Sequence, residues 1–166
     1  MALEVYQKKR KFSQTPEPPG QAKTKSASHF VIQKHRATAL HFDFRLELPD
    51  NIFKSQAHPL KFARGERRRV VLKSWAVPKN LPPKAGVKRL AVQTEDHPVD
   101  YLNFQGIIPQ GNYGAGKVEI WDKGKFKLIE AKPRSLKFEL KGKKLKGNYV
   151  LFNLPGKNWL IFKIRN

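Results

Sequence analysis

Hydrophobic and polar residues alternate strictly along residues 41–48, HFDFRLEL. Successive side chains of an extended chain point to opposite faces, so this pattern predicts a strand. The apolar face carries Phe42, Phe44, Leu46 and Leu48, and the polar face carries His41, Asp43, Arg45 and Glu47. The apolar face belongs to a core. Unpaired charges are costly to bury, so the polar face should line a solvated groove or surround a ligand.

A second short strand precedes this one over residues 29–35, HFVIQKH, and residues 36–39 connect the two. Pairing as a hairpin would place His35 across from His41, where facing side chains are about 5 Å apart. The two imidazoles and the carboxylate of Asp43 would then converge. Such a set suits a divalent metal with N/O preference, such as Mn, Fe or Zn. The alternative is a strand whose polar face is merely solvated.

Further short segments with strand character follow at even spacing. They are VVLKSWAV, RLAVQT, KVEIW, LKFEL, KLKGNYVLFNL and NWLIFKI. We expect the glycines between residues 106 and 116 to make tight bends, and residues 121–124, WDKG, to form a hairpin turn. Many short strands with little helix predict an all-β fold, a closed or nearly closed antiparallel β-barrel, which removes exposed strand edges.

The chain length of 166 residues favours a single domain, 1–166. Residues 1–28 form a basic N-terminal arm that begins as a short helix. We expect residues 1–18 to dock on the barrel and residues 19–27, which are rich in small polar residues, to be mobile.

Lysine and arginine number 34 against 13 acidic residues, which gives a formal charge of +21. A charge of this size implies a polyanionic partner, and phosphate backbones are the commonest one. A basic loop insertion at 49–71 carries the run Arg67–Arg69, which is either a solvated face or an extension of a phosphate-binding surface. An anionic membrane surface is the competing partner, but no long amphipathic or apolar helix is visible. Nucleic acid is therefore the preferred partner.

Cysteine is absent, which excludes thiol nucleophiles, disulfides and cysteine-based zinc sites. The N-terminus lacks the apolar region of a secretion signal. We therefore expect a cytoplasmic, nucleoid-associated protein, and the net charge favours a monomer. Farther along, Pro98 restricts His97 to an extended conformation, so the backbone aims this imidazole. A histidine aimed in this way among acidic residues is a candidate functional residue.

Several stretches, taken together, resemble the 3′-phosphoesterase domain of bacterial DNA ligase D. They are KRKFSQTPEP, HFVIQKHRATALHFDFRLEL, LKSWAVPKN, LAVQTEDHPVDYLNFQGIIPQGNYGAGKVEIWDKG and GNYVLFNL with NWLIFKI. The resemblance implies a β-barrel enzyme of non-homologous end joining that depends on Mn²⁺, with other divalent cations as alternatives. Its substrates would be DNA 3′ ends, a primer-template with a 3′-ribonucleotide or a 3′-phosphate, and a DNA ligase would be a partner. No ligase or polymerase segment is visible, so we expect a stand-alone form.

The resemblance also implies roles for eight residues. The metal-associated motif falls on His35, His41 and Asp43, further catalytic positions on Arg45, His97 and Tyr101, and the phosphate side on Arg10 and Arg89 together with Arg45 and His97. The implied reaction is phosphodiester cleavage of a 3′-terminal ribonucleoside, followed by removal of the 3′-phosphate to leave a hydroxyl. His97 would be a general acid or a phosphate contact, and Tyr101 would donate a hydrogen bond.

Two positions depart from the family pattern, and two other functions compete. Lys11 and Gln105 stand where the family usually has acidic residues. The missing acid next to Arg10 would remove a contact in the pocket. The two replacements would fit a non-catalytic basic module that only binds DNA ends. An Fe(II) oxygenase is the second alternative, because His41 and Asp43 followed later by His97 imitate a two-histidine, one-carboxylate triad.

Overall fold

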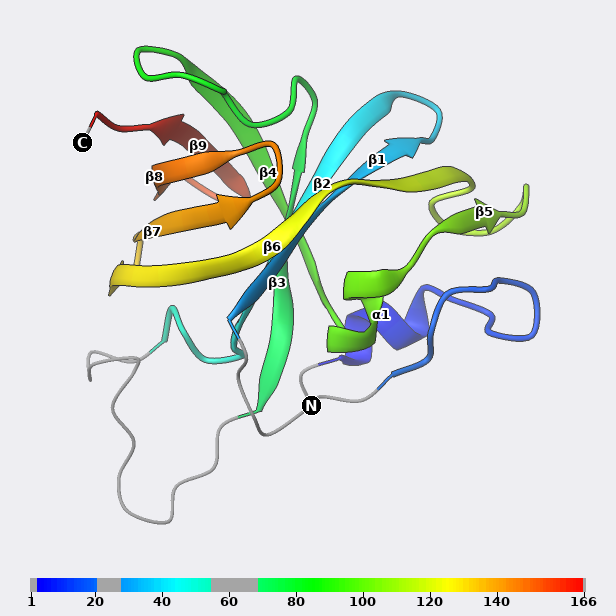
Figure 1. Cartoon of the computed structure of the whole chain (residues 1–166). Helices are drawn as coiled ribbons and strands as arrows, with labels where there is room; N and C mark the ends of the chain where they lie inside the picture. Colours follow the sequence, from blue (N-terminus) through cyan, green and yellow to red (C-terminus); the bar gives the residue numbers. More distant parts are fainter. Residues whose placement is uncertain (1–2, 21–27, 55–68, 166) are drawn as a thin grey trace.

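The computed structural model describes residues 3–20, 28–54 and 69–165. The elements are α1 (Glu4–Lys8), β1 (His29–Arg36), β2 (Leu40–Pro49), β3 (Val70–Val77), β4 (Lys88–His97), the 3₁₀ helix η1 (Val99–Asn103), β5 (Gly106–Ile108), β6 (Gly116–Lys132), β7 (Ser135–Gly142), β8 (Lys146–Asn153) and β9 (Asn158–Lys163). Figure 1 shows the strands wrapped around a common centre, with α1 and β5 together on one side. No helix among these residues has the length and apolar character needed to cross a membrane.

The strands form one antiparallel sheet that closes on itself. Its order is β1-β2-β3-β4-β9-β8-β7-β6, and β6 pairs back with β1, so eight strands make a closed ring. The short strand β5 adds to β6 outside this ring. The predicted all-β barrel with a short N-terminal helix is confirmed. Closure pairs both edges of the sheet, which removes the unpaired backbone groups that an open edge would present.

Inward-facing side chains of all eight ring strands fill the barrel. The predicted apolar face of β2 takes part, with Phe44, Leu46 and Leu48 buried in this core and Phe42 packed against it. The aromatic rings of Trp75 and Phe138 both pack near Phe44, at centroid distances of 6.2 and 5.7 Å. Burial of these large apolar side chains is the main force that holds the barrel together.

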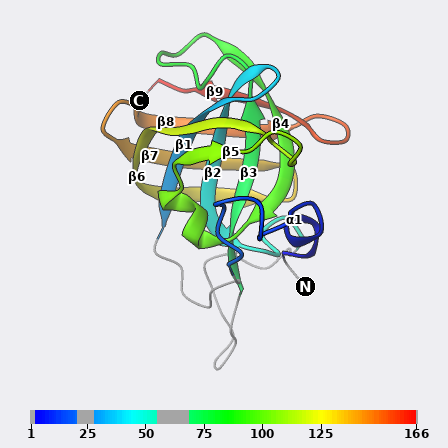
Figure 2. The same ribbon diagram turned by 90° about the vertical axis from the view of Figure 1, so that its right-hand side faces the viewer.

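A second apolar cluster lies on the outside of the barrel. Val31 of β1 and Leu72 of β3 point outward and are covered by Tyr6 of the arm and by Leu102 and Phe104. In Figure 2, α1, the 3₁₀ helix and β5 lie in front of β2 and β3. The predicted docking of the arm is thus confirmed for its described part, whereas residues 21–27 lie outside the described residues.

The predicted hairpin turn at residues 121–124 is wrong, because these residues lie within the continuous strand β6. Asp122, which suggested a turn, instead accepts hydrogen bonds from the backbone N–H groups of residues 143–145 and so caps the turn between β7 and β8. Gly124 is required by close packing: a Cβ there would lie 2.3 Å from the carbonyl oxygen of Lys141 on β7. The turn-like residues therefore serve contacts with a neighbouring strand.

Both ends of the basic insertion at 49–71 are ordinary barrel structure. β2 continues to Pro49, β3 begins at Val70, and Ile52 is buried in the barrel core. The middle of the insertion, residues 55–68, includes two of the three arginines of the run at 67–69 and lies outside the described residues.

Candidate active site

The polar face of β2 lies on the outer wall of the barrel, beneath the arm and the segment that follows β4. Asp43 and Arg45 are only 6% and 3% exposed, so the polar face does not line an open groove, the first of the two expected arrangements. A cavity of about 270 Å³ remains above them. Its lining includes seven of the eight predicted residues, all except Arg89: Arg10, His35, His41, Asp43, Arg45, His97 and Tyr101.

His35 and His41 face each other across the β1–β2 hairpin, in the register expected from the sequence. The ring centroids are 4.8 Å apart. The carboxylate of Asp43 reaches both rings, with 3.2 Å from Oδ2 to His35 Nδ1 and 3.2 Å from Oδ1 to His41 Nε2. One ligand atom from each residue can be chosen so that all lie within 4.8 Å of one another. The predicted convergence is therefore present.

Backbone carbonyls fix which nitrogen of each ring carries a proton. His35 Nε2 lies 2.7 Å from the carbonyl oxygen of Gly114, and His41 Nδ1 lies 3.1 Å from that of Ala39. A carbonyl only accepts, so each neutral ring donates there and turns its other nitrogen, with a lone pair, toward Asp43. A lone pair facing a carboxylate is repulsive unless a proton or a cation lies between them. Histidines held by a carbonyl in this way are typical metal ligands, and this buried cluster could hold a metal ion.

Asp43 is an anion at neutral pH despite its burial. Burial alone favours the neutral acid. The charge of Arg45, together with hydrogen bonds from His35 and His41 when a proton lies between ring and carboxylate, outweighs burial and holds the pKa of Asp43 well below its usual range. The hydrogen bond with Asp43 in turn raises the pKa of His41 against the effect of partial burial. The cluster therefore offers a charged oxygen ligand between two imidazoles.

Arg45 lies beside this cluster with one nitrogen unsatisfied. Its Nε donates to Gln33 Oε1 at 2.7 Å, its Nη2 lies 3.6 Å from Asp43 Oδ2, and its guanidinium stacks over the ring of Tyr101 at 4.7 Å. Its Nη1 is buried and finds no hydrogen-bond acceptor among the described residues. A buried donor without an acceptor is destabilising, so an oxyanion in the cavity would supply what is missing.

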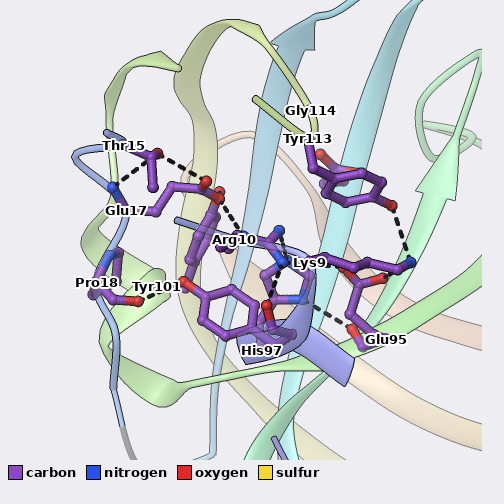
Figure 3. A network of polar contacts seen from close by, with 12 residues as sticks. Lys9, Arg10, Thr15, Glu17, Pro18, Glu95, His97, Tyr101, Tyr113 and Gly114 are labelled. Atoms are coloured by element: carbon purple, nitrogen blue, oxygen red, sulfur yellow. Dashed lines mark hydrogen bonds and ion pairs between the residues drawn. The ribbon is translucent and has the colours of Figure 1, made fainter. Parts of the chain in front are cut away.

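A second guanidinium reaches the cavity from the N-terminal arm, as Figure 3 shows. Arg10 donates from Nε to Glu17 Oε2 at 2.9 Å, and its Nη1 lies 3.3 Å from Glu95 Oε1. The hydroxyl of Tyr101 also donates to Glu17 Oε2, at 2.6 Å. Two buried carboxylates thus hold Arg10 in place, so the arm contributes part of the site.

His97 is neutral and orients Arg10. Its Nδ1 donates to the carbonyl oxygen of Glu95 at 2.9 Å, and its Nε2 accepts from Arg10 Nη2 at 3.3 Å. Burial, reinforced by the charges of Arg45 and Arg10, lowers the pKa of His97 well below its ordinary value. A general acid would need a proton on Nε2, where the guanidinium already donates. The geometry therefore favours a phosphate-side role for His97 over the general-acid role.

Comparison with known proteins decides the family. The model of the DNA Ligase D 3′-phosphoesterase domain matches residues 60–153, more than half of the chain. The chain belongs to this family. It is therefore a phosphoesterase domain, of a family whose chemistry is hydrolysis.

Three relatives match the phosphoesterase domain along 99% of its length. The multifunctional non-homologous end joining protein LigD of Pseudomonas aeruginosa is 42% identical over 177 residues. The proteins of the same name from Mycobacterium bovis and Mycolicibacterium smegmatis are 41% and 40% identical. The chain spans about a fifth of the length of these relatives, 19%, 20% and 21% respectively.

Arg89 does not join the other predicted site residues of the phosphoesterase domain. It pairs with Ile161 of β9, whose side chain is in the barrel core. Paired residues of neighbouring strands point to the same face of a sheet, so Arg89 points to the inner face of the barrel, whereas the cavity lies on the outer wall. Its Nη1 donates to the carbonyl oxygens of residues 79–81, at 2.7 to 3.4 Å. The structure therefore does not bring Arg89 to this cavity, and its guanidinium braces a loop at the barrel end.

The two departures from the family pattern lie away from the cavity lining. Gln105 Oε1 accepts from the backbone N–H of Ile120 at 2.9 Å, a contact that a glutamate oxygen would make equally well. Lys11 is exposed, next to the buried guanidinium of Arg10. Neither replacement removes a side chain from the wall of the cavity.

Sequence reasoning missed three residues that hold the arginines of the phosphoesterase domain, namely Glu17, Gln33 and Glu95. Gln33 could have been found, because it lies two residues before His35 and directly opposite Asp43. Glu17 carries a weaker signal as an acid within a basic arm. Which cation it meets depends on how the arm docks.

The depressed pKa of His97 predicts a loss of stability in mild acid. The unfolded chain takes up this proton below the ordinary value of 6.5, whereas the folded domain does not. The contribution of His97 to the free energy of unfolding therefore falls as the pH drops below 6.5, by at most about 1.4 kcal/mol per pH unit. Urea unfolding of wild type and His97→Asn between pH 5 and 8 measures it: the variant should show the shallower decline. Parallel curves would contradict a neutral buried His97.

Proposed function

We propose that this phosphoesterase domain processes DNA 3′ ends, removing a 3′-terminal ribonucleoside and then the 3′-phosphate to leave a 3′-hydroxyl for repair. The observation that carries the proposal is the unsatisfied Nη1 of Arg45, buried beside the cluster of His35, His41 and Asp43. A phosphate oxygen would satisfy the guanidinium while another lies toward the cluster. The charge of +21 suits a nucleic acid substrate.

His35, His41 and Asp43 would hold the metal, for which we propose Mn²⁺, although the donor set also suits other divalent cations. Such an ion, when bound, polarises a phosphoryl oxygen and lowers the pKa of water. The groups that orient these ligands belong to the protein itself. Asp43 keeps the two imidazoles oriented, and the carbonyls of Ala39 and Gly114 keep their lone pairs directed to the same point.

Arg45 and Arg10 would neutralise the charge that grows on the phosphate oxygens. A guanidinium can donate two parallel N–H groups to one phosphate, and a site prearranged in this way need not reorganise during the reaction. We propose that His97 and Tyr101 act on the same phosphate, His97 by orienting Arg10 and Tyr101 by supporting Arg45 and fixing Glu17. The 3′-hydroxyl product is what a DNA ligase partner acting at the nucleoid would require.

A primer-template that ends in a 3′-phosphate tests this proposal. With Mn²⁺ we expect release of inorganic phosphate and a 3′-hydroxyl end, and with EDTA we expect neither. A second primer-template with one 3′-ribonucleotide should yield the 3′-phosphate intermediate first. Firm DNA binding without phosphate release in Mn²⁺, Mg²⁺, Co²⁺ or Zn²⁺ would contradict the proposal and leave a module that only binds DNA ends.

The oxygenase alternative drawn from the sequence relied on His97, which lies outside the metal-ligand cluster, and the match to a phosphoesterase family speaks against it. Its triad would need His97 beside His41 and Asp43, but the third member of the cluster is His35. Both ring nitrogens of His97 are engaged elsewhere, with Glu95 and Arg10.

A further inference from the structure

Tyr113 is a large aromatic residue at the rim of the cavity. It is 47% exposed, whereas the other aromatic residue of the cavity lining, Tyr101, is 2% exposed. Most of the remaining lining consists of charged side chains, histidines and small residues. The ring of Tyr113 therefore offers an exposed aromatic surface next to the charged pocket.

The position of Tyr113 is fixed relative to the metal-ligand cluster. It lies in the turn between β5 and β6, where the backbone N–H of Asn112 donates to Pro109 and that of Ala115 donates to Asn112. The next residue along, Gly114, provides the carbonyl that holds His35. A Cβ on Gly114 would lie 3.4 Å from His35 Cε1, so the loop packs directly against this imidazole.

Cations lie against the same ring. Lys9 Nζ is 4.6 Å from the ring centroid and 3.3 Å from the hydroxyl oxygen, and the guanidinium carbon of Arg10 is 5.3 Å from the centroid. Figure 3 shows Tyr113 beside both side chains. Lys9 is 38% exposed along its side chain and can change rotamer, so the ring is not permanently covered.

We propose that Tyr113 stacks on the base of the nucleotide that carries the reacting phosphate. A phosphate bound at Arg45 leaves its nucleoside to exit past the rim, and an uncharged, flat base gains little from the charged lining. Bases stack on exposed aromatic rings irrespective of sequence. The inference rests on the proposed function and adds a specificity residue: the substrate would be a nucleotide end with an intact base, not any phosphate ester.

Binding, measured without turnover, tests this inference separately from catalysis. Two primer-templates with a 5′ fluorophore differ only at the 3′ end, which carries either a normal nucleotide 3′-phosphate or an abasic sugar 3′-phosphate. Fluorescence anisotropy with EDTA gives Kd for each. Wild type should bind the normal end about 10-fold more tightly. Tyr113→Leu should bring this ratio near one, and Tyr113→Phe, which keeps the ring, should keep it.

Phe152→Leu is the matched control, because Phe152 is 46% exposed on β8 and does not line the cavity. It should show the wild-type ratio. A ratio unchanged by Tyr113→Leu, or equal weakening of both ends, would overturn the inference. Mn²⁺-dependent phosphate release together with a Tyr113-independent ratio would overturn it while supporting the proposed function. A Tyr113-dependent ratio without phosphate release would support the inference and contradict the proposed function.

Discussion

Replacing Asp43 by alanine should lower the proposed Mn²⁺-dependent release of a 3′-phosphate by roughly 10³-fold or more, the scale of losing a group that stabilises transition-state charge. The carboxylate contacts both imidazoles of the cluster and is ionised at neutral pH. Its removal takes away the anionic ligand and the group that aligns the other two. Steady-state rates with a 3′-phosphate primer-template measure the effect, and titration of Mn²⁺ by calorimetry should show weakened binding in parallel.

Loss of Asp43 also leaves the buried guanidinium of Arg45 without its neighbouring anion, so the alanine variant will be less stable. Asp43→Asn keeps the shape of the side chain and separates chemistry from folding, with circular dichroism as the check. Glu130→Ala is the control, because Glu130 is exposed and pairs with Lys132 on the barrel surface. If a folded Asp43→Asn domain keeps its Mn²⁺ affinity and rate, the metal assignment is wrong.

Arg45→Lys should have the second-largest effect, a fall in kcat/KM of roughly 10²-fold. Lysine keeps the positive charge but loses the planar fork that donates to Gln33, stacks on Tyr101 and carries the unsatisfied Nη1. The charge alone should therefore not restore activity. Inorganic phosphate offers a second readout: it should raise the Tm of wild type, because a ligand that binds only the folded state stabilises it, and it should do so much less for the variant.

Arg134→Lys is the matched control for this substitution. Arg134 donates to the backbone carbonyl of Asn153, and it does not line the cavity. The control should keep the wild-type rate and the wild-type response to phosphate. An Arg45→Lys domain with an unchanged KM and an unchanged phosphate-dependent rise in Tm would show that the anion binds elsewhere.

Local sequence patterns were sufficient for the centre of the site. The period of two along residues 41–48 separates Asp43 and Arg45 from the core residues, and a short connection leaves little freedom in the hairpin register. His35 therefore had to face His41. Gln33 follows from the same register, because it lies directly opposite Asp43.

Contacts between residues distant in sequence could not be predicted from local patterns. The family resemblance pointed to Arg10, His97 and Tyr101, and docking of the arm beside β4 brings them together. The same resemblance pointed to Arg89, which the structure does not bring to the cavity, because its pairing with Ile161 turns it to the inner side. The turn signal at Trp121–Gly124 failed for a similar reason, since Asp122 and Gly124 serve contacts with β7 and its turn.

The sequence by itself determined the strands, the barrel class and the meeting of His35, His41 and Asp43, and its charge of +21 favours a polyanionic partner. The tertiary structure decided that the polar face of β2 is covered, which carboxylates hold Arg10, and that the buried Nη1 of Arg45 has no acceptor among the described residues. The physical reason is that alternation assigns each side chain to one of two faces of a strand. It cannot say which distant segment will cover that face, and that cover sets the burial, the hydrogen-bond partners and the pKa values of the site.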